Sequence, residues 1–138
     1  LVHKQRAETS SAIAARVRVA REMQACRFAG CSIHVNAEMS GEMTDRFCNL
    51  TDECKVLIEE LANRLGLSAR AFTRILKLSR TIADLEVARE ICGNQDHGSY
   101  EEYIQEQLAN DCSWPHIQPR HIMEAVGYRF LDRMNMMM

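Results

Sequence analysis

Residues 65–85 constrain the fold of this chain most, because they combine a helix stop, a helix start and a two-sided helix in one stretch. Gly66 can take the left-handed backbone conformation that ends an incoming helix. Ser68 can accept a hydrogen bond from the first amides of the next helix, which the spacing predicts to begin near Ala69. At roughly 100° per residue, the apolar side of that helix carries Phe72, Ile75, Leu76, Ser79, Ile82 and Ala83.

The other side of this predicted helix is basic and carries Arg70, Arg74, Lys77 and Thr81. Arg70 falls in the first turn, where the positive end of the helix dipole disfavours a cation. The planar guanidinium suits a phosphate, and the amides of a helix start favour the same ligand. Exposed arginines and lysines are nevertheless most often simply solvated. The residues alone leave both interpretations open.

Helical periodicity covers most of the chain, and no alternating run predicts a strand, so the predicted fold class is all-α, a small helical bundle. Further helices are expected from Ser10 or Ser11 to about Phe28, over residues 40–47, from a Thr51 cap to Leu65, over residues 99–109 and from Pro119 to about Leu131.

The first of these helices has an apolar side and several basic residues. We expect it to pack through Ile13, Val17, Ala20, Gln24 and Phe28. Its other faces carry Arg16, Arg18, Arg21 and Arg27. A solvated face is the commoner role of such arginines. The sequence leaves open whether they contact solvent, nucleotide or DNA.

The length of 138 residues suits one domain with its own core. We expect a linker end over residues 1–9, a helical domain over 10–132 and a disordered Met-rich tail over 133–138. The net charge of -2 argues against a dedicated polyanion binder, although a local basic face remains compatible with it. No apolar run approaches the roughly 20 residues that are needed to cross a bilayer. No signal peptide is evident, and the first residue is not Met. We therefore expect a cytoplasmic fragment of a longer protein, without membrane contact.

The six cysteines form no Cys-x-x-Cys pair. The nearest ligand-like sets are irregularly spaced, and they are Cys26, Cys31 and His34, and Cys112, His116 and His121. Reduced, mostly buried thiols are the better interpretation, so no metal site is expected. No histidine has a Ser or Cys partner that the sequence nominates for nucleophilic catalysis.

Two specific interpretations compete for residues 61–77. The first is a helix-turn-helix, because residues 61–68 followed by an arginine-rich helix resemble the DNA-reading unit of AraC-type regulators. Arg70, Arg74 and Lys77 would then face the major groove. This local match gives no reason for the helix to continue through residues 80–85.

The second interpretation covers nearly the whole chain. Five motifs carry it, and they read NAEMS over 36–40, LSARAF over 67–72, RILK over 74–77, RTIADL over 80–85 and EAVGYR over 124–129. In this order they closely resemble the C-terminal domain of magnesium chelatase-like AAA+ ATPases of the ComM/YifB type. The resemblance implies a helical lid over ATP that is bound mainly by a preceding α/β domain. By position, Arg70 matches the sensor 2 arginine, which reaches the γ-phosphate. Arg74 and Lys77 match the motif without a known role.

The same resemblance implies partners that lie outside this sequence. They are an N-terminal ATPase core that binds ATP with Mg²⁺, neighbouring subunits of a hexameric ring and, for ComM-like members, DNA during branch migration in natural transformation. Two departures matter. Residues 89–117 form an apparent insertion before the last helix, and the chain contains no Gly-x-x-x-x-Gly-Lys-Ser/Thr loop. We therefore expect no catalysis by the chain alone. A passive interaction module is a third interpretation, with the inserted helix and the Met-rich tail as its contact surface.

Overall fold

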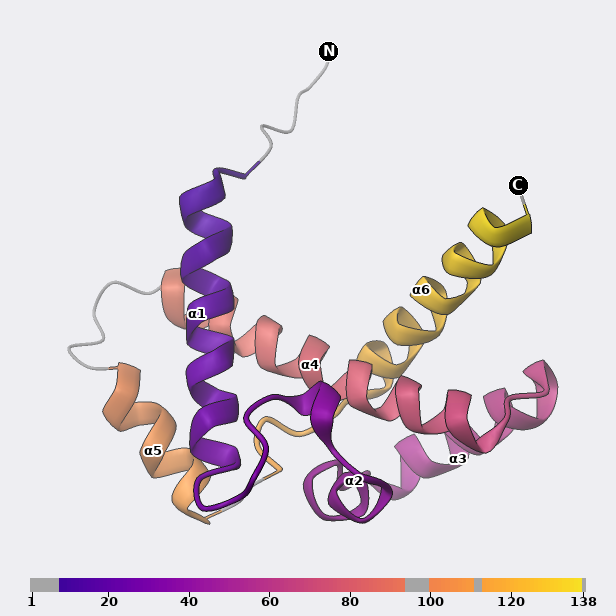
Figure 1. The fold of residues 1–138 in the computed structure, drawn as a ribbon, viewed down its shortest axis with the longest axis horizontal. Coiled ribbons are helices and arrows are strands. Elements are labelled where there is room, and N and C mark those ends of the chain that lie inside the picture. Colours follow the sequence, from indigo (N-terminus) through magenta and orange to yellow (C-terminus); the bar gives the residue numbers. More distant parts are fainter. Residues whose placement is uncertain (1–7, 94–99, 111–112, 138) are drawn as a thin grey trace.

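A computed structural model describes residues 8–93, 100–110 and 113–137 of the chain (Figure 1). Every regular element in these ranges is helical, which confirms the all-α class. The elements are α1 (Ser10–Arg27), the short 3-10 helix η1 (Asn36–Glu38), α2 (Gly41–Phe47), α3 (Asp52–Leu65), α4 (Ala69–Gly93), α5 (Tyr100–Asn110) and α6 (Pro119–Met137). No helix within the described ranges is both long enough and apolar enough to cross a membrane.

Side-chain caps begin the first three α-helices. Thr9 caps α1, one residue before the predicted Ser10, and its hydroxyl accepts from the amide of Ala12 at 3.1 Å. Ser40 caps α2 and Thr51 caps α3 in the same way. Such caps satisfy amides that have no partner within the helix, and each typically stabilises by about 1 kcal/mol.

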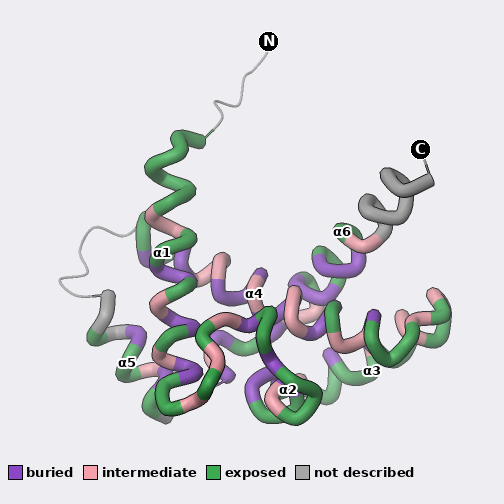
Figure 2. Tube along the Cα trace, in the orientation of Figure 1, coloured by how far each residue is buried: buried purple, intermediate pink, exposed green. Residues whose placement is uncertain are grey.

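Helix α4 is the central element, since α1, α2, η1 and α6 all pack against it. Its N-terminal half shares a core with α2, α3 and α6 that includes Phe47, Ile58 and Ile122. Its C-terminal half shares a second core with α1 and α5. Figure 2 shows buried residues along α4 on both sides of its midpoint. The predicted apolar side is confirmed for Ile75, Leu76, Ser79, Ile82 and Ala83, which are all buried.

Helix α5 lies within the predicted insertion at 89–117, close to the expected 99–109 helix. It packs against α1, where Ile104 and Leu108 join a cluster with Val19 and Met23. Ser99, where this helix was expected to begin, lies outside the described residues. Helix α6 runs to Met137, past the expected end near Leu131. The division of the chain at residues 9 and 132, the insertion and the disordered tail stay predictions.

A polar clasp joins α4 to the start of α6. Glu86 on α4 accepts hydrogen bonds from Arg120 and lies 3.1 Å from Nε2 of His121. Nδ1 of His121 accepts from the amide of Gln118 at 2.9 Å, so Nε2 carries the hydrogen that faces Glu86. The hydrogen bond from Arg120 is the main cause that lowers the pKa of Glu86 to about 2.

This clasp predicts an acid-sensitive contribution to stability. The pKa of Glu86 is about 2 in the folded chain, and a glutamate without these contacts, as in the unfolded chain, has a pKa of 4.5. The stabilisation is therefore present above pH 4.5 and is lost as the pH falls towards 2. Glu86→Gln should therefore flatten the dependence of the free energy of unfolding on pH in this window, measured by urea denaturation. Glu59→Gln, an exposed change on α3, serves as the control. Identical pH profiles for Glu86→Gln and the parent would contradict this assignment.

Candidate phosphate-contact site

The turn between α3 and α4 forms as the sequence predicts. Gly66 ends α3 with φ of 63°, in the left-handed region. The hydroxyl of Ser68 accepts from the amide of Ala71 at 3.1 Å, and α4 begins at Ala69. Arg70 consequently lies in the first turn of α4, and its side chain is exposed. A cation stands here beside amides that carry partial positive charge, an arrangement that an anion would stabilise.

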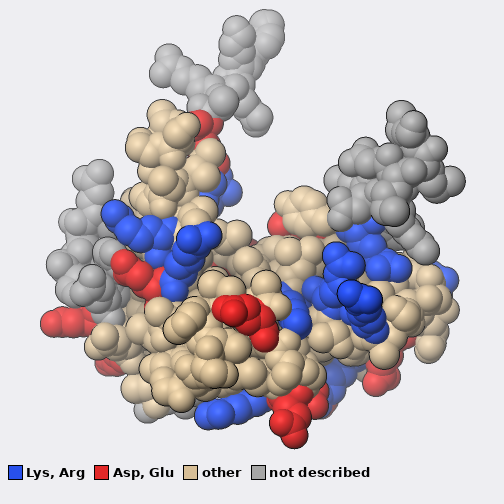
Figure 3. All heavy atoms as spheres, viewed as in Figure 1, with Lys and Arg blue, Asp and Glu red and all other residues tan. Residues whose placement is uncertain are grey.

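The basic stripe of α4, defined as Arg70, Arg74 and Lys77, is open at one end and covered at the other. Arg70 and Arg74 are exposed, whereas Lys77 is half-buried and donates to the carbonyl of Ala37 at 3.2 Å. Figure 3 shows Lys and Arg side chains gathered over the side of the molecule where α6 and the N-terminal half of α4 lie. Arg70 and Arg74 are thus available to a ligand, whereas Lys77 is hydrogen-bonded to η1.

The stripe ends at a buried polar cluster, defined as Gln24, Arg27, Asn36, Arg80 and Asp84. One helical turn past Lys77, the hydroxyl of Thr81 accepts from Asn36 at 3.1 Å. The side-chain amide of Asn36 also donates to the Asp84 carboxylate at 2.8 Å. Its backbone amide donates to the side-chain carbonyl of Gln24 at 2.8 Å. The 3-10 helix η1 therefore lies across α4 from Lys77 to Asp84. This crossing leaves Arg70 and Arg74 outside.

The ion pair of Arg27 and Asp84 lies at the centre of this buried cluster. The guanidinium donates to both carboxylate oxygens, at 2.9 and 2.7 Å, and neither side chain is accessible to solvent. Arg27 also donates to the carbonyl of Trp114 at 2.7 Å. Because the pair joins α1 to α4 and reaches the segment after α5, it fixes three parts of the chain against one another.

Arg80 forms the second half of the cluster and is fully buried. Its guanidinium donates to the carbonyls of Phe47 and Ser113, and its Nε lies 3.7 Å from the Asp84 carboxylate. These contacts join the end of α2 and the segment after α5 to α4. The motif over residues 80–85, which the helix-turn-helix interpretation leaves unexplained, therefore supplies the buried charges that hold α4 in place.

The structure corrects two expectations for α1. Arg27 was expected on an outer face, but its exposed fraction is 3% because it neutralises the buried Asp84. Ile13 and Val17 were expected in the core, yet they are 43% and 38% exposed. The buried side is formed by Val19, Ala20, Met23, Gln24 and Arg27. Arg18 and Arg21 are exposed, and Arg16 pairs with Glu8 at 2.5 Å.

Cysteines and histidines offer no alternative site in the parts of the chain that are described. No three metal-ligating side chains come together there. Cys48 and Cys54 are buried, and burial raises the pKa of the Cys48 thiol to about 11. Cys26 and Cys31 are half-buried, Cys92 is exposed and Cys112 lies outside the described residues. His121 is engaged in the α6 clasp.

The chain is similar to several known proteins. Residues 7–97 match the family described as "Magnesium chelatase, subunit ChlI C-terminal". The chain is 36% identical to the competence protein ComM of Haemophilus influenzae over 129 residues, which are 94% of this chain and 19% of that protein. It is 30% identical to YifB of Salmonella typhimurium over 132 residues, which are 96% of this chain and 20% of that protein. The chain thus spans about a fifth of the length of these relatives. No solved structure gives a significant match.

The buried cluster predicts a large cost when one of its charges is removed. Asp84→Ala leaves Arg27 buried without its carboxylate, so the free energy of unfolding should fall by about 3–5 kcal/mol in urea denaturation. The double variant Arg27→Met, Asp84→Leu should lose less than the sum of the two single changes, because Arg27 is no longer a buried charge without its carboxylate. The loss of the longer contact between Arg80 and Asp84 is common to both Asp84 variants. Glu8→Ala, which breaks an exposed pair, is the control and should change stability little. An Asp84→Ala variant as stable as the parent would refute the role of this pair.

Proposed function

Because the chain belongs to the magnesium chelatase subunit ChlI C-terminal family, with ComM and YifB among its relatives, we propose that it is the lid of an AAA+ ATPase. In this proposal Arg70 is the sensor 2 residue, which contacts the γ-phosphate of ATP bound by a preceding domain. The supporting observation is that Arg70 is exposed at the capped start of a helix whose remaining length is fixed by buried charges.

The available side chains fit a phosphate. The guanidinium of Arg70 can donate two hydrogen bonds to phosphate oxygens, and Arg74 one turn later adds a second positive charge on the same stripe. Lys77 is a weaker candidate, because its ammonium already donates to Ala37. ATP with Mg²⁺ would supply the reactive phosphoanhydride. This chain would contribute positive charge near the γ-phosphate, while the metal ligands would come from the preceding domain.

We propose three kinds of partner for the full-length protein, supported by the family match and by the greater length of the relatives. They are the preceding ATPase core, neighbouring subunits of a ring, conventionally a hexamer, and DNA as the substrate of the whole motor. The Haemophilus relative is a competence protein, which favours DNA among the substrates. We propose no chelation of magnesium by a porphyrin, because similarity to a chelatase subunit concerns the motor and not its substrate.

The sensor role of Arg70 is tested in the full-length protein. Arg70→Ala should lower the ATPase kcat by about tenfold or more, because it removes a charge that stabilises the transition state. The helical circular dichroism should not change, since the side chain is exposed. Arg70→Lys should restore only part of the rate, because lysine lacks the planar fork. Arg64→Ala, also exposed and near the end of α3, is the matched control. Parental ATPase activity in Arg70→Ala would reject the assignment.

A helix-turn-helix DNA reader is the second candidate, favoured by the Gly66 turn and the exposed arginines that follow it. Against it, η1 covers the α4 stripe from Lys77 onwards, so only the first two turns are open to a groove. The 138-residue chain should therefore bind duplex DNA weakly and without sequence preference in fluorescence anisotropy titrations at two salt concentrations. Sequence-selective binding with a Kd of about 10⁻⁸ M or lower would favour the reader instead.

A further inference from the structure

The first turns of α1 pack little against the other described helices, although Thr9 caps the helix and Glu8 lies 3.9 Å from Arg89 of α4. Residues 10–14 are exposed, and the first buried residue of α1 is Val19. Figure 1 shows this end of α1 extending away from the other helices. Isolated helical turns are marginal in water, and most helical stability in proteins comes from packing of an apolar face. The apolar residues here, Ile13 and Val17, are 43% and 38% exposed.

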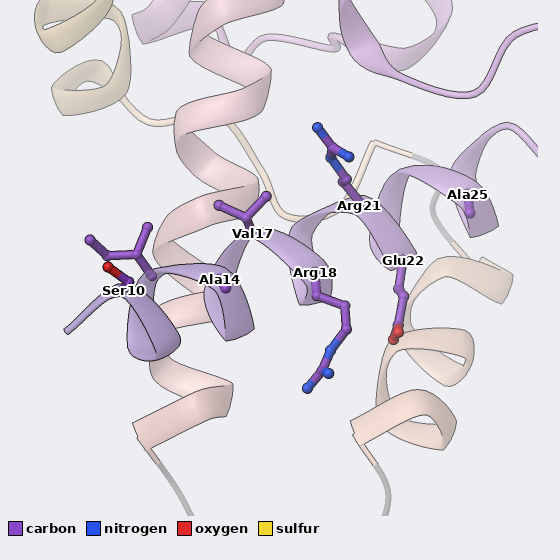
Figure 4. A pocket seen from close by; sticks show the side chains of 8 residues that line it. Ser10, Ala14, Val17, Arg18, Arg21, Glu22 and Ala25 are labelled. Carbon is purple, nitrogen blue, oxygen red and sulfur yellow. The ribbon is translucent and has the colours of Figure 1, made fainter.

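These residues line a groove on the outward face of α1. Its volume is about 630 Å³, and its lining comprises Ser10, Ile13, Ala14, Val17, Arg18, Arg21, Glu22 and Ala25. At 100° per residue, Ala14, Val17 and Arg21 lie on the side of α1 opposite to the buried Val19 and Met23. In Figure 4, Val17 and Arg21 point to one side of the groove, and Arg18 and Glu22 point to the other. All eight lining residues belong to α1, so the groove is a shallow, open strip of helix surface on which apolar side chains lie beside Arg18 and Arg21.

We propose that this groove is the docking surface for the polypeptide that precedes residue 1 in the full-length protein. This inference rests on the proposed function, in which an ATPase core precedes the lid. Two observations favour that occupant over other partners. The chain spans about a fifth of its relatives' length, and the family match begins at residue 7, just before α1. A preceding domain would therefore be tethered within a few residues of the groove, which raises its effective concentration there.

The side chains of the groove indicate which kind of surface on the preceding domain would bind there. Ile13, Ala14 and Val17 would pack against an apolar surface. Arg18 and Arg21 have no hydrogen-bond or ion-pair partner recorded in the described part of the chain, so carboxylates on the docked surface would complement them. Arg16 is not available for this role, because it lies on the other side of α1 and pairs with Glu8. The occupant is therefore an apolar surface of the preceding domain that is edged by Asp or Glu.

Docking is tested by amide hydrogen exchange of residues 10–18 in the full-length protein. Ile13→Gln combined with Val17→Gln removes the apolar contact but keeps residues of good helix propensity. Exchange of these amides should accelerate about tenfold or more relative to the parent, because the contact that holds the helix is lost. Val56→Gln, a change at a more exposed apolar residue on α3, should leave exchange at residues 10–18 unchanged. Unchanged exchange over α4 shows that the variant has folded.

Charge reversal at Arg18 and Arg21 is the second variant and should also accelerate exchange over residues 10–18. Parental exchange rates in both variants would overturn the docking proposal. Protection that rises with protein concentration would also overturn it, since a second copy would then occupy the groove. Arg70→Ala should alter ATPase activity without altering this exchange. Failure of the sensor assignment is therefore distinguishable from failure of the docking surface.

Discussion

The buried ion pair between Arg27 and Asp84 is the interaction on which the rest of the structure depends. It joins the last turn of α1 to the middle of α4, and its remaining hydrogen-bonding capacity is used by Asn36 and the carbonyl of Trp114. Two opposite charges without solvent contact are costly to bring together and more costly to separate. The cluster therefore specifies one arrangement of α1, η1 and α4, because any other would leave a charge buried without its partner.

This constraint determines which part of the basic stripe is open. The stripe runs along one side of α4 towards Thr81, and Asn36 joins Thr81 to Asp84. Since η1 is held at that point, it covers the stripe as far as Lys77 and stops short of Arg74. The exposed pair of arginines is a consequence of where the buried cluster lies. If the chain is the lid of an ATPase motor, as we propose, this cluster would make it move as a rigid unit and carry Arg70 with it.

The features of this fold that depend on neighbouring residues could be predicted from the sequence better than those that depend on distant partners. The Gly66 stop, the Ser68 and Thr51 caps and the apolar side of α4 follow from short-range rules, and each is present. On α1, Ala20, Gln24 and Phe28 are buried as predicted, whereas Arg27 was placed on an outer face because periodicity counts an arginine as outward-facing. Gln24 and Arg27 are both held on the buried side by polar residues elsewhere in the chain. Their partners Asn36 and Asp84 are 12 or more residues away in sequence. Only the resemblance, and no pattern of polarity, marked residues 80–85 as a unit.

The central claim is that a rigid helical scaffold presents Arg70 to a phosphate. A structure of the full-length protein with a non-hydrolysable ATP analogue and Mg²⁺ tests it most directly. The account predicts a guanidinium nitrogen of Arg70 at hydrogen-bond distance, about 2.7–3.2 Å, from a γ-phosphate oxygen, with the Arg27–Asp84 pair intact. An Arg70 side chain directed into solvent, with the γ-phosphate bound by other cations, would contradict it.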